Sequence, residues 1–277
     1  MVDLAPASDG GSSGKHRLAI VMPSVGTRPW ADRCAETFSW YAAACGATLH
    51  VETTLPTFEE FPFPKLADRP GRKMKLAYAC KAYFAWSYLT RHGYDRVAVV
   101  DDTCCVRAGS PDLFAVVPFG SCGYTRTSAS HAQDSFQEIE RFVEETNMPA
   151  VPFDPRRYMN SGVMVYDRTM TSALSPDKIC ACAPLLFARA PNQTMMYYLL
   201  AAGGVPQHEL PKAFNTMPAG KLPTAQRREL EDVDGHIDPG VFIYHLSAFY
   251  THRARLLSQI TDVFLKEWRE LDPGSVR

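Results

Sequence analysis

The first part of the chain alternates between short apolar runs and longer segments with apolar residues at helical spacing. Leu18–Met22 is an apolar run followed by Pro23, which predicts a buried strand and then a turn. Trp30–Ala44 predicts a helix that ends at Gly46, and Ala47–Val51 has the β-branched alternation of a second strand. This order of strand, helix and strand predicts an α/β fold.

The next two elements lead into a pair of acidic residues. Lys73–Arg91 carries apolar residues at helical spacing, and Arg96–Val100 is an apolar run that passes directly into Asp101 and Asp102. A continuous apolar run is typical of a strand buried on both faces, as parallel strands are in α/β folds. Because such folds bind ligands at the carboxyl ends of their strands, this junction is the first candidate site.

The pattern becomes more mixed after residue 120. It predicts helices at Ala132–Thr146, Pro191–Ala202 and Thr251–Leu271, and strands at Gly162–Tyr166 and Val241–Leu246. The segment Thr53–Arg72 holds four prolines and reads as a long loop, which in a compact domain is usually functional or mobile. With no internal repeat and no clear linker, residues 17–277 are predicted to form one domain behind a flexible Gly/Ser-containing leader at residues 1–16.

Composition and charge narrow the function classes. The 277 residues have a formal net charge of −1 and a sequence pI near 6.7, which excludes a general polyanion binder and predicts no nucleic-acid partner. No apolar run reaches the roughly 18–20 residues of a membrane span, and the leader is not a signal peptide. The eight cysteines, with no C-x-x-C pair, are interpreted as reduced core thiols of a cytoplasmic protein rather than as a zinc site.

Asp101 and Asp102 are candidate ligands of a divalent cation. Two acids in a turn are an ordinary surface feature, but here they end an apolar strand. Neighbouring carboxylates at a buried edge repel each other and raise each other's pKa, and a divalent cation would relieve that repulsion. Oxygen ligands suit Mg²⁺ or Mn²⁺, which characteristically join carboxylates to a nucleotide diphosphate.

Further polar residues stand at the ends of later elements. Asn160 and Ser161 lead into the predicted strand that begins at Gly162, where a glycine allows another group to approach the backbone. Asn192 is a plausible N-cap, which would explain it without any function. Asn215 lies in a loop between apolar residues, and His245 ends a predicted strand, where a lone histidine is more often a hydrogen-bonded core residue than a metal ligand.

In their order these motifs resemble the GT-A glycosyltransferases, and within them family 8, the glycogenin and bacterial galactosyltransferase group. The resemblance covers residues 17–255. It rests on Lys81-Ala-Tyr-Phe-Ala-Trp86, Val99-Val-Asp-Asp-Thr103, Asn160-Ser-Gly-Val-Met-Val165, Asn192-Gln193, Leu210-Pro…Phe214-Asn215 and His245-Leu-Ser. It implies a Rossmann-like nucleotide-diphospho-sugar transferase domain with a mixed, mainly parallel central sheet flanked by helices.

The sequence departs from the family pattern in three places. The acidic motif is Asp-Asp-Thr instead of Asp-x-Asp. Alignment on Asp112-Leu-Phe114 puts Asp101 in the first acid position and Thr103 in the second, whereas alignment on the threonine puts Asp102 in the second. The family's Asp-Gln is Asn-Gln here. The Gly…Lys-Pro-Trp that follows the family's histidine is missing, and His252, Arg253 or Arg255 would replace its lysine on the diphosphate.

The resemblance implies a metal-dependent transfer of a sugar from a nucleotide-diphosphate sugar, with UDP expected, to an acceptor hydroxyl with retention of configuration. The acceptor would be a glycan, a lipid or a protein, bound by residues 53–72 and 213–226, and a homodimer is possible. Mn²⁺ or Mg²⁺ would bind Asp101, Asp102, Thr103 and His245. The nucleotide sugar would contact Pro23, Ser24, Thr27, Arg28, Lys81, Asp101, Asp102, Ser161, Gly162, Asn215, His252 and Arg253, and the catalytic residues would be Asn160, Asn192 and Gln193.

Two other functions remain open. Gly26-Thr27-Arg28 echoes part of the phosphate loop of sugar-1-phosphate nucleotidyltransferases, but that loop needs several glycines whose backbone amides cradle a triphosphate. The Asp-Asp-Thr and Asn-Gln departures motivate the second alternative, a non-catalytic nucleotide-sugar binder.

Overall fold

The computed structural model describes most of the chain. The residues described are 16–26, 28–57, 59–61, 72–127, 129–188, 190–217, 237–246 and 253–271, without the side chains of 72–75, 129–131 and 253–256. The predicted leader lies outside this part except for His16. Most of the two predicted acceptor loops lies outside it as well.

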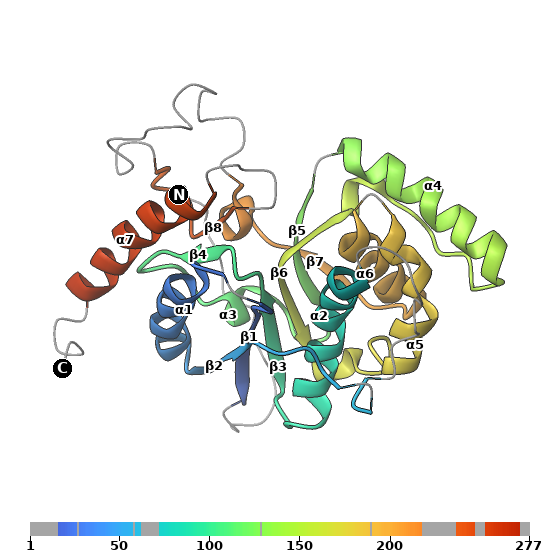
Figure 1. Ribbon diagram of the computed structural model, residues 1–277, viewed down its shortest axis with the longest axis horizontal. Coiled ribbons are helices and arrows are strands. Elements are labelled where there is room, and N and C mark those ends of the chain that lie inside the picture. The colour runs from blue at the N-terminus through green and yellow to red at the C-terminus, as the bar shows by residue number, and fades with distance from the viewer. Residues whose placement is uncertain are drawn as a thin grey trace.

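A six-stranded mixed sheet forms the centre of the molecule (Figure 1). Its order is β2-β1-β3-β6-β5-β7, with parallel pairing at β2/β1, β1/β3 and β5/β7 and antiparallel pairing on both sides of β6. The sheet is therefore mixed and mainly parallel, as expected. Its strands are β1 Leu18–Pro23, β2 Ala47–Glu52, β3 Arg96–Val100, β5 Cys122–Arg126, β6 Met159–Asp167 and β7 Gln207–Glu209.

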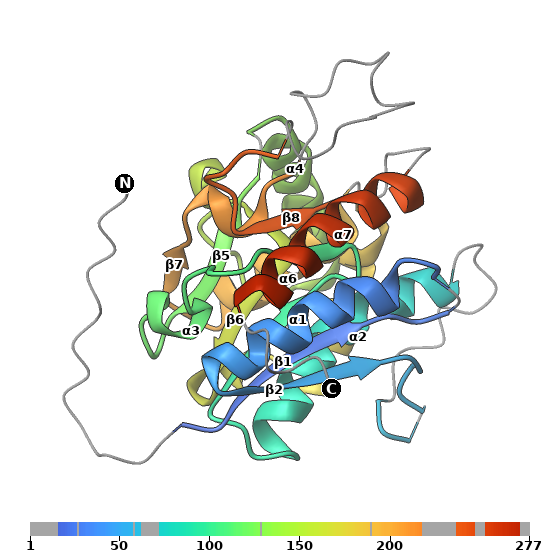
Figure 2. The ribbon, with the colours of Figure 1, turned by 90° about the vertical axis from the view of Figure 1, so that its left-hand side faces the viewer.

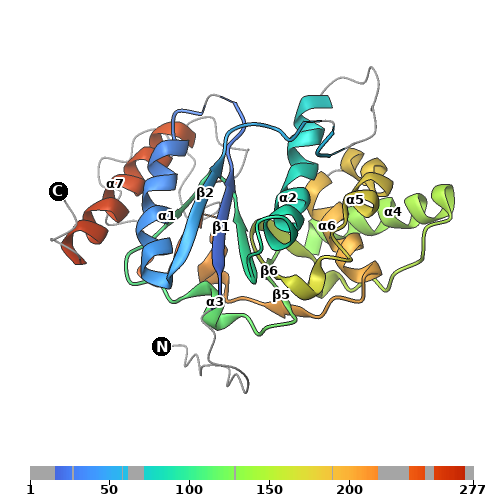
Figure 3. The same cartoon turned by 90° about the horizontal axis from the view of Figure 1, so that it is seen from below.

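Helices cover both faces of this sheet, which Figure 3 shows edge-on. One face carries α1 (Ala31–Cys45) and α7 (Arg253–Leu271), which lie side by side in Figure 2. The other carries α2, α5 and α6, with α4 packed beyond them, whereas the short α3 packs on the α1 side, where Leu113 lies in the same core as Phe38. Their bounds are α2 Arg72–Thr90, α3 Leu113–Val116, α4 Ala129–Thr146, α5 Pro176–Ala181 and α6 Pro191–Ala202.

The continuous apolar run of β3 is explained by burial on both faces. Val97 and Val99 face the core under α2, α5 and α6, whereas Ala98 and Val100 face the core under α1 and α7. The strand pairs in parallel only with β1, because its other neighbour, β6, is antiparallel. An apolar run of this kind therefore indicates two covered faces rather than parallel pairing on both sides.

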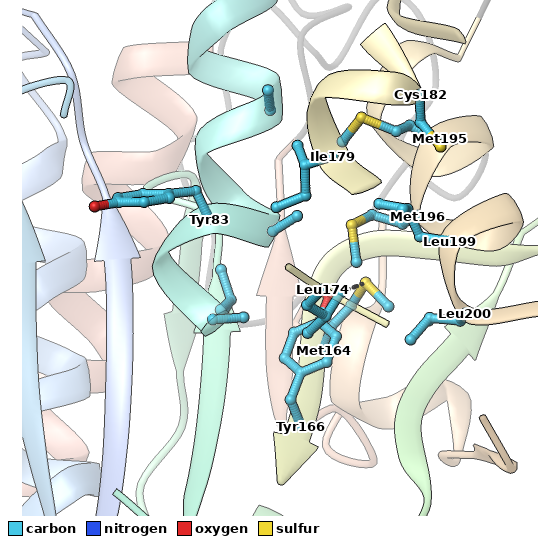
Figure 4. Packing of buried hydrophobic residues seen from close by; sticks show 14 of the residues in the cluster. Tyr83, Met164, Tyr166, Leu174, Ile179, Cys182, Met195, Met196, Leu199 and Leu200 are labelled. Carbon is cyan, nitrogen blue, oxygen red and sulfur yellow. Dashed lines mark hydrogen bonds between the residues drawn. The ribbon is translucent and has the colours of Figure 1, made fainter. Parts of the chain in front are cut away.

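The larger core lies between the sheet and the helices α2, α5 and α6. Met164 and Tyr166 of β6 meet Ile179 of α5 and Met195 and Met196 of α6 (Figure 4). All five side chains are buried. Unbranched methionines fill irregular space well, which suits a core made by a sheet and several short helical segments.

A second, two-stranded sheet connects α7 to the acidic junction. It consists of β4 (Cys104–Val106) and β8 (Ile243–His245), paired antiparallel. The Trp268 indole of α7 donates a hydrogen bond to the Val106 carbonyl over 3.1 Å. This small sheet places His245 directly opposite Cys104, three residues after Asp101.

Several boundaries differ from the sequence prediction. β6 begins at Met159 rather than at Gly162, so Asn160 and Ser161 belong to the strand and not to a turn before it. The predicted strand Val241–Leu246 is reduced to three residues, and α4 begins at residue 129 instead of 132.

The described helices and cysteines bear on two further expectations. None of those helices is both long enough and apolar enough to cross a bilayer. The eight cysteines are free thiols, six of them buried. Burial raises the pKa of Cys104 and Cys105, so these thiols stay protonated at neutral pH.

Candidate active site

Asp101 joins four elements at the carboxyl end of β3. Its backbone amide donates to the Gly162 carbonyl of β6 over 2.9 Å. Its carboxylate forms an ion pair with Lys81 of α2, and its Oδ2 lies 3.3 Å from Nε2 of His245. Lys81 also donates to the Ser161 carbonyl over 3.3 Å. Lys81, Asp101, Ser161 and His245 are therefore brought together. The sequence had assigned Lys81, Asp101 and Ser161 to the nucleotide sugar, and Asp101 and His245 to the metal.

Asp102 faces a different set of partners. Its Oδ2 accepts a hydrogen bond from the Ser24 hydroxyl over 3.0 Å and lies 3.1 Å from Nε of Arg28. Ser24 and Arg28 belong to the segment that follows β1, which is parallel to β3 and adjacent to it. Because parallel neighbours end at the same edge of a sheet, the acidic pair and the β1 exit meet there.

The two carboxyl groups differ in their electrostatics. Burial alone would raise the pKa of Asp101, but the Lys81 ammonium and the His245 ring lower it to about 2. Burial also raises the pKa of Asp102; Arg28 opposes this rise and the Asp101 charge adds to it. Each acid therefore already has its own protein cation. The expected rise in pKa is therefore found at Asp102, where the Asp101 charge contributes to it, but not at Asp101.

His245 is buried between Asp101 and an asparagine. Its Nδ1 lies 2.9 Å from Oδ1 of Asn215, which ends the 3₁₀ segment Lys212–Asn215. A Cβ built on Gly162 would collide with this ring at Cε1 and Nδ1. Gly162 therefore allows the close approach that was expected of a glycine at the start of the predicted strand, and the approaching group is His245.

Asn160 links β6 to the same asparagine. Its Oδ1 accepts hydrogen bonds from the Gly162 amide over 2.8 Å and from Nδ2 of Asn215 over 2.9 Å. The pairing of β6 with β5 is irregular here: Tyr124 pairs with Met164 but Thr125 pairs with Asn160. Such a bulge re-aims side chains beside a site.

Asn192 is not the N-cap of its helix. α6 begins at Pro191 and the cap position belongs to Ala190, so Asn192 is the second helical residue. Proline is favoured at the first helical position, and the helix begins at Pro191 as its predicted bounds have it, two residues before the start that a cap at Asn192 would require. The Asn192 side chain is buried, and neither amide atom has a hydrogen-bond partner among the described residues.

Gln193 and the remaining predicted residues make no hydrogen bond or ion pair with the acidic pair within the described part of the chain. Gln193 hydrogen-bonds to Tyr158, whose hydroxyl also meets Ser135 and Thr194. Pro23 ends β1, and the Thr103 carbonyl accepts from Leu246. Thr27, His252 and the side chains of Arg253 and Arg255 lie outside the described residues.

Sequence reasoning did not single out Thr125. Its buried hydroxyl has no partner among the described residues, and it pairs with Asn160 across the bulge. No local signal distinguishes it from any other threonine of a strand. The contact between Asn215 and His245 was also missed, because 30 residues separate them.

The possible metal ligands form an incomplete set. In the described residues, no three side chains drawn from His, Cys, Asp and Glu are grouped closely enough to hold a metal ion. Asp101 and His245 supply one carboxylate oxygen and one ring nitrogen 3.3 Å apart. Two ligands at right angles around a cation with bonds of about 2.1 Å lie about 3 Å apart, and Mg²⁺ sites commonly combine one or two protein groups with substrate phosphates. These two residues therefore fit a cation that a diphosphate helps to hold.

Together, the mixed sheet and the acidic site at its strand ends define the class of fold. No protein-family model matches the sequence, and no curated protein matches it. Solved glycosyltransferase structures share the fold. One, involved in the glycosylation of the major capsid of PBCV-1, matches with a TM-score of 0.53 and 10% identity, over 87% of this chain and 99% of that chain. The WbbM bifunctional glycosyltransferase, in its apo form, gives 0.52 and 11%, over 93% of this chain and 52% of that chain. The chain therefore has a GT-A-like fold.

Proposed function

We propose that this chain is a glycosyltransferase of family 8 type, which transfers a sugar from a nucleotide-diphosphate sugar to an acceptor hydroxyl. The carrying observation is the Asp101 carboxylate, held between Lys81 and His245 at the carboxyl end of β3, in a fold shared with glycosyltransferases. Ligands of open α/β sheets bind at this edge. We propose UDP as the nucleotide and retention of the anomeric configuration, on the resemblance described above.

Lys81 and Arg28 would bind the diphosphate. Negative charge grows on this leaving group as the glycosidic bond breaks, and fixed positive charges that face it lower the barrier. Lys81 and Arg28 are held at the strand ends by Asp101 and Asp102, so little reorganisation is needed when the donor arrives. His252 and Arg253 remain proposals for the same role.

Asp101 and His245 would hold a divalent cation together with the donor. When bound, the cation supplies positive charge to the diphosphate oxygens. A ring nitrogen in the ligand set favours Mn²⁺ over Mg²⁺, because imidazole is the softer ligand. Asp102 faces Ser24 and Arg28, so we assign it to orienting Arg28 rather than to the metal. Thr103 is a further proposed ligand.

Asn192 would contact the donor sugar. A buried amide without a partner costs folding free energy, and a sugar hydroxyl can both donate to it and accept from it. Its neighbour Gln193 would lie near the reacting carbon or the acceptor. The backbone of the β6 bulge, at Asn160, Ser161 and Gly162, would form the rest of the surface that faces the donor sugar.

A donor screen tests the proposal. The protein is mixed with a panel of UDP-sugars and Mn²⁺, and release of UDP is measured with and without candidate acceptors. We expect release with at least one donor and its loss in Asp101→Asn. The matched control is Glu36→Gln, which makes the same chemical change at an exposed ion pair with Arg269.

Two further assays, pyrophosphate formation and UDP-sugar binding, separate the two alternatives. Pyrophosphate formed from a nucleoside triphosphate and a sugar phosphate would indicate a nucleotidyltransferase. Tight UDP-sugar binding without turnover for any donor would indicate a non-catalytic binder. Either result would replace the proposed transferase.

A further inference from the structure

A chain of hydrogen bonds with a fixed direction ends at His245. It starts at the backbone amide of Gly162, which can only donate. This amide lies 2.8 Å from one side-chain atom of Asn160, and that atom must therefore be the carbonyl oxygen Oδ1. The orientation of the Asn160 amide is thus set by the backbone, not by a choice between two equivalent positions.

The second asparagine, Asn215, continues the chain with donor and acceptor in the same order. Oδ1 of Asn160 also lies 2.9 Å from Asn215, and only the Asn215 amide nitrogen can donate to it. The Asn215 oxygen is then left facing Nδ1 of His245 over 2.9 Å. Because that oxygen only accepts, Nδ1 must carry a hydrogen.

The other ring nitrogen has a different environment. Nε2 of His245 lies 3.3 Å from Oδ2 of Asp101, longer than the 2.7–2.9 Å of a hydrogen bond between a charged donor and a carboxylate. The Asp101 carboxylate already has a cationic partner in Lys81. With its hydrogen fixed on Nδ1, the ring leaves Nε2 as the nitrogen that faces Asp101 and that can bind a cation.

We infer that Asn160 and Asn215 are positioning residues that hold His245 in the tautomer with its hydrogen on Nδ1. Nε2 then presents a lone pair beside the Asp101 carboxylate, as a cation ligand must. Histidines that bind metals usually donate their other ring hydrogen to such a partner. The inference rests on the proposed function only for the identity of the cation; the tautomer is a property of the folded chain.

The β6 bulge contributes twice to this arrangement. Gly162 supplies the first donor of the chain through its amide, and its missing side chain leaves the space that the His245 ring occupies. The ring is buried, so water does not compete for Nδ1. One glycine therefore sets both the place of the ring and the direction of its hydrogen bond.

Nitrogen NMR tests the tautomer directly. Metal-free protein labelled with ¹⁵N-histidine is examined at pH 8, and the His245 signals are assigned from their loss in His245→Gln. We expect the Nδ1–H tautomer in the unmodified protein. In Asn215→Ala, Asp101 becomes the remaining acceptor and the hydrogen moves to Nε2. Asn160→Asp keeps an oxygen acceptor and should retain the original signature. An Nε2–H tautomer or a doubly protonated ring in the unmodified protein would overturn the inference.

Metal binding provides a second, independent measurement. Free Mn²⁺ is quantified by electron paramagnetic resonance, with Mn²⁺ alone and with Mn²⁺ plus UDP. Asn215→Ala should weaken Mn²⁺ binding by about 10- to 100-fold, the range found when partners of metal-bound histidines are removed. Thr216→Val is the control, because it removes only the hydrogen bond from that hydroxyl to the Lys212 carbonyl.

The two measurements separate the possible failures. An Nδ1–H signature with no Mn²⁺ binding would support the chain of hydrogen bonds to His245 and contradict the metal of the proposed function. If Asn215→Ala leaves both the tautomer and the Mn²⁺ affinity unchanged, Asn215 does not position His245, whatever the donor screen finds. If Asn215→Ala does not fold, the spectrum of the unmodified protein still decides the tautomer.

Discussion

Gly162 lies so close to the ring of His245 that the space between them is too small for a methyl group. The two residues are 83 positions apart in the printed sequence, on different sheets. Their contact joins the β6 bulge to the small sheet formed by β4 and β8. The position of the histidine therefore depends on a residue that carries no functional group.

Replacement of Gly162 by alanine should displace His245. The added Cβ collides with a ring that is buried and tied to Asn215, so relief requires the ring or the backbone to move. Overpacking of this kind costs about 1–3 kcal/mol of unfolding free energy. Chemical denaturation measures the loss, and Mn²⁺ binding should weaken in the same variant. Gly109→Ala is the control, because it introduces strain at a positive φ with no atom nearby. Full Mn²⁺ affinity in Gly162→Ala would contradict the close packing.

Asp101 and Asp102 should contribute unequally to metal binding. Asp101 lies beside His245, whereas Asp102 faces Ser24 and Arg28. Asp101→Asn is therefore expected to weaken Mn²⁺ binding by at least about tenfold, equivalent to about 1.4 kcal/mol, and Asp102→Asn by much less. Calorimetry with Mn²⁺ in the presence of UDP measures both. Equal losses would return Asp102 to the metal ligands.

Much of the fold was predictable because its long elements carry strong patterns. β1 and β3 are continuous apolar runs with buried side chains, α1 carries apolar residues at helical spacing on its buried face, and α6 is an apolar segment buried along most of its length. Two short strands were not found: β4 and β7 contain three residues each, too few for any periodicity, whereas β8 was predicted as the longer strand Val241–Leu246. Such strands exist through pairing with distant partners, as β4 does with β8.

The candidate site was predictable in its residue types but not in its pairings. The end of an apolar strand pointed to Asp101 and Asp102. Nothing in the local sequence assigns Lys81 to Asp101 and Arg28 to Asp102, because these pairings depend on which helix and which strand lie beside β3. The predicted cap at Asn192 was wrong because propensity alone does not locate the first turn of a helix.

Acid should destabilise the protein partly through His50. Burial lowers the pKa of this ring, with His92 acting in the same direction and Glu52 opposing it; the ring also contacts Tyr88 and Tyr94. The folded pKa lies below the unfolded value of about 6.5, so the unfolded chain binds more protons as the pH falls. His50 therefore contributes stability above pH 6.5 that is lost as the pH falls through the folded pKa.

Denaturation from pH 7.5 to 5 measures this contribution. His50→Gln removes the titration and should flatten the decline in unfolding free energy. Burial also lowers the pKa of His208, so part of the slope should remain in His50→Gln and should diminish further when His208→Gln is added. If neither substitution changes the slope, folding does not lower the pKa of either histidine.

Asn192 should limit stability while it supports activity. Both amide atoms are buried without a partner in the described chain, so the folded state bears a desolvation cost that a smaller apolar side chain avoids. Asn192→Ala is expected to raise the unfolding free energy by about 1 kcal/mol, since relief of an unpaired buried polar group outweighs a small cavity. If this amide binds a hydroxyl of the donor sugar, turnover should fall by about 10²-fold while UDP affinity stays within about twofold.

Thr194→Val is the matched control on the same helix. The Thr194 hydroxyl forms hydrogen bonds with Ser135 and the Ala190 carbonyl, so its loss should reduce stability. Calorimetry with UDP, denaturation and turnover are measured on both variants. A less stable Asn192→Ala protein would mean that the amide has partners in the folded chain, and a stable variant with full turnover would remove Asn192 from the sugar site.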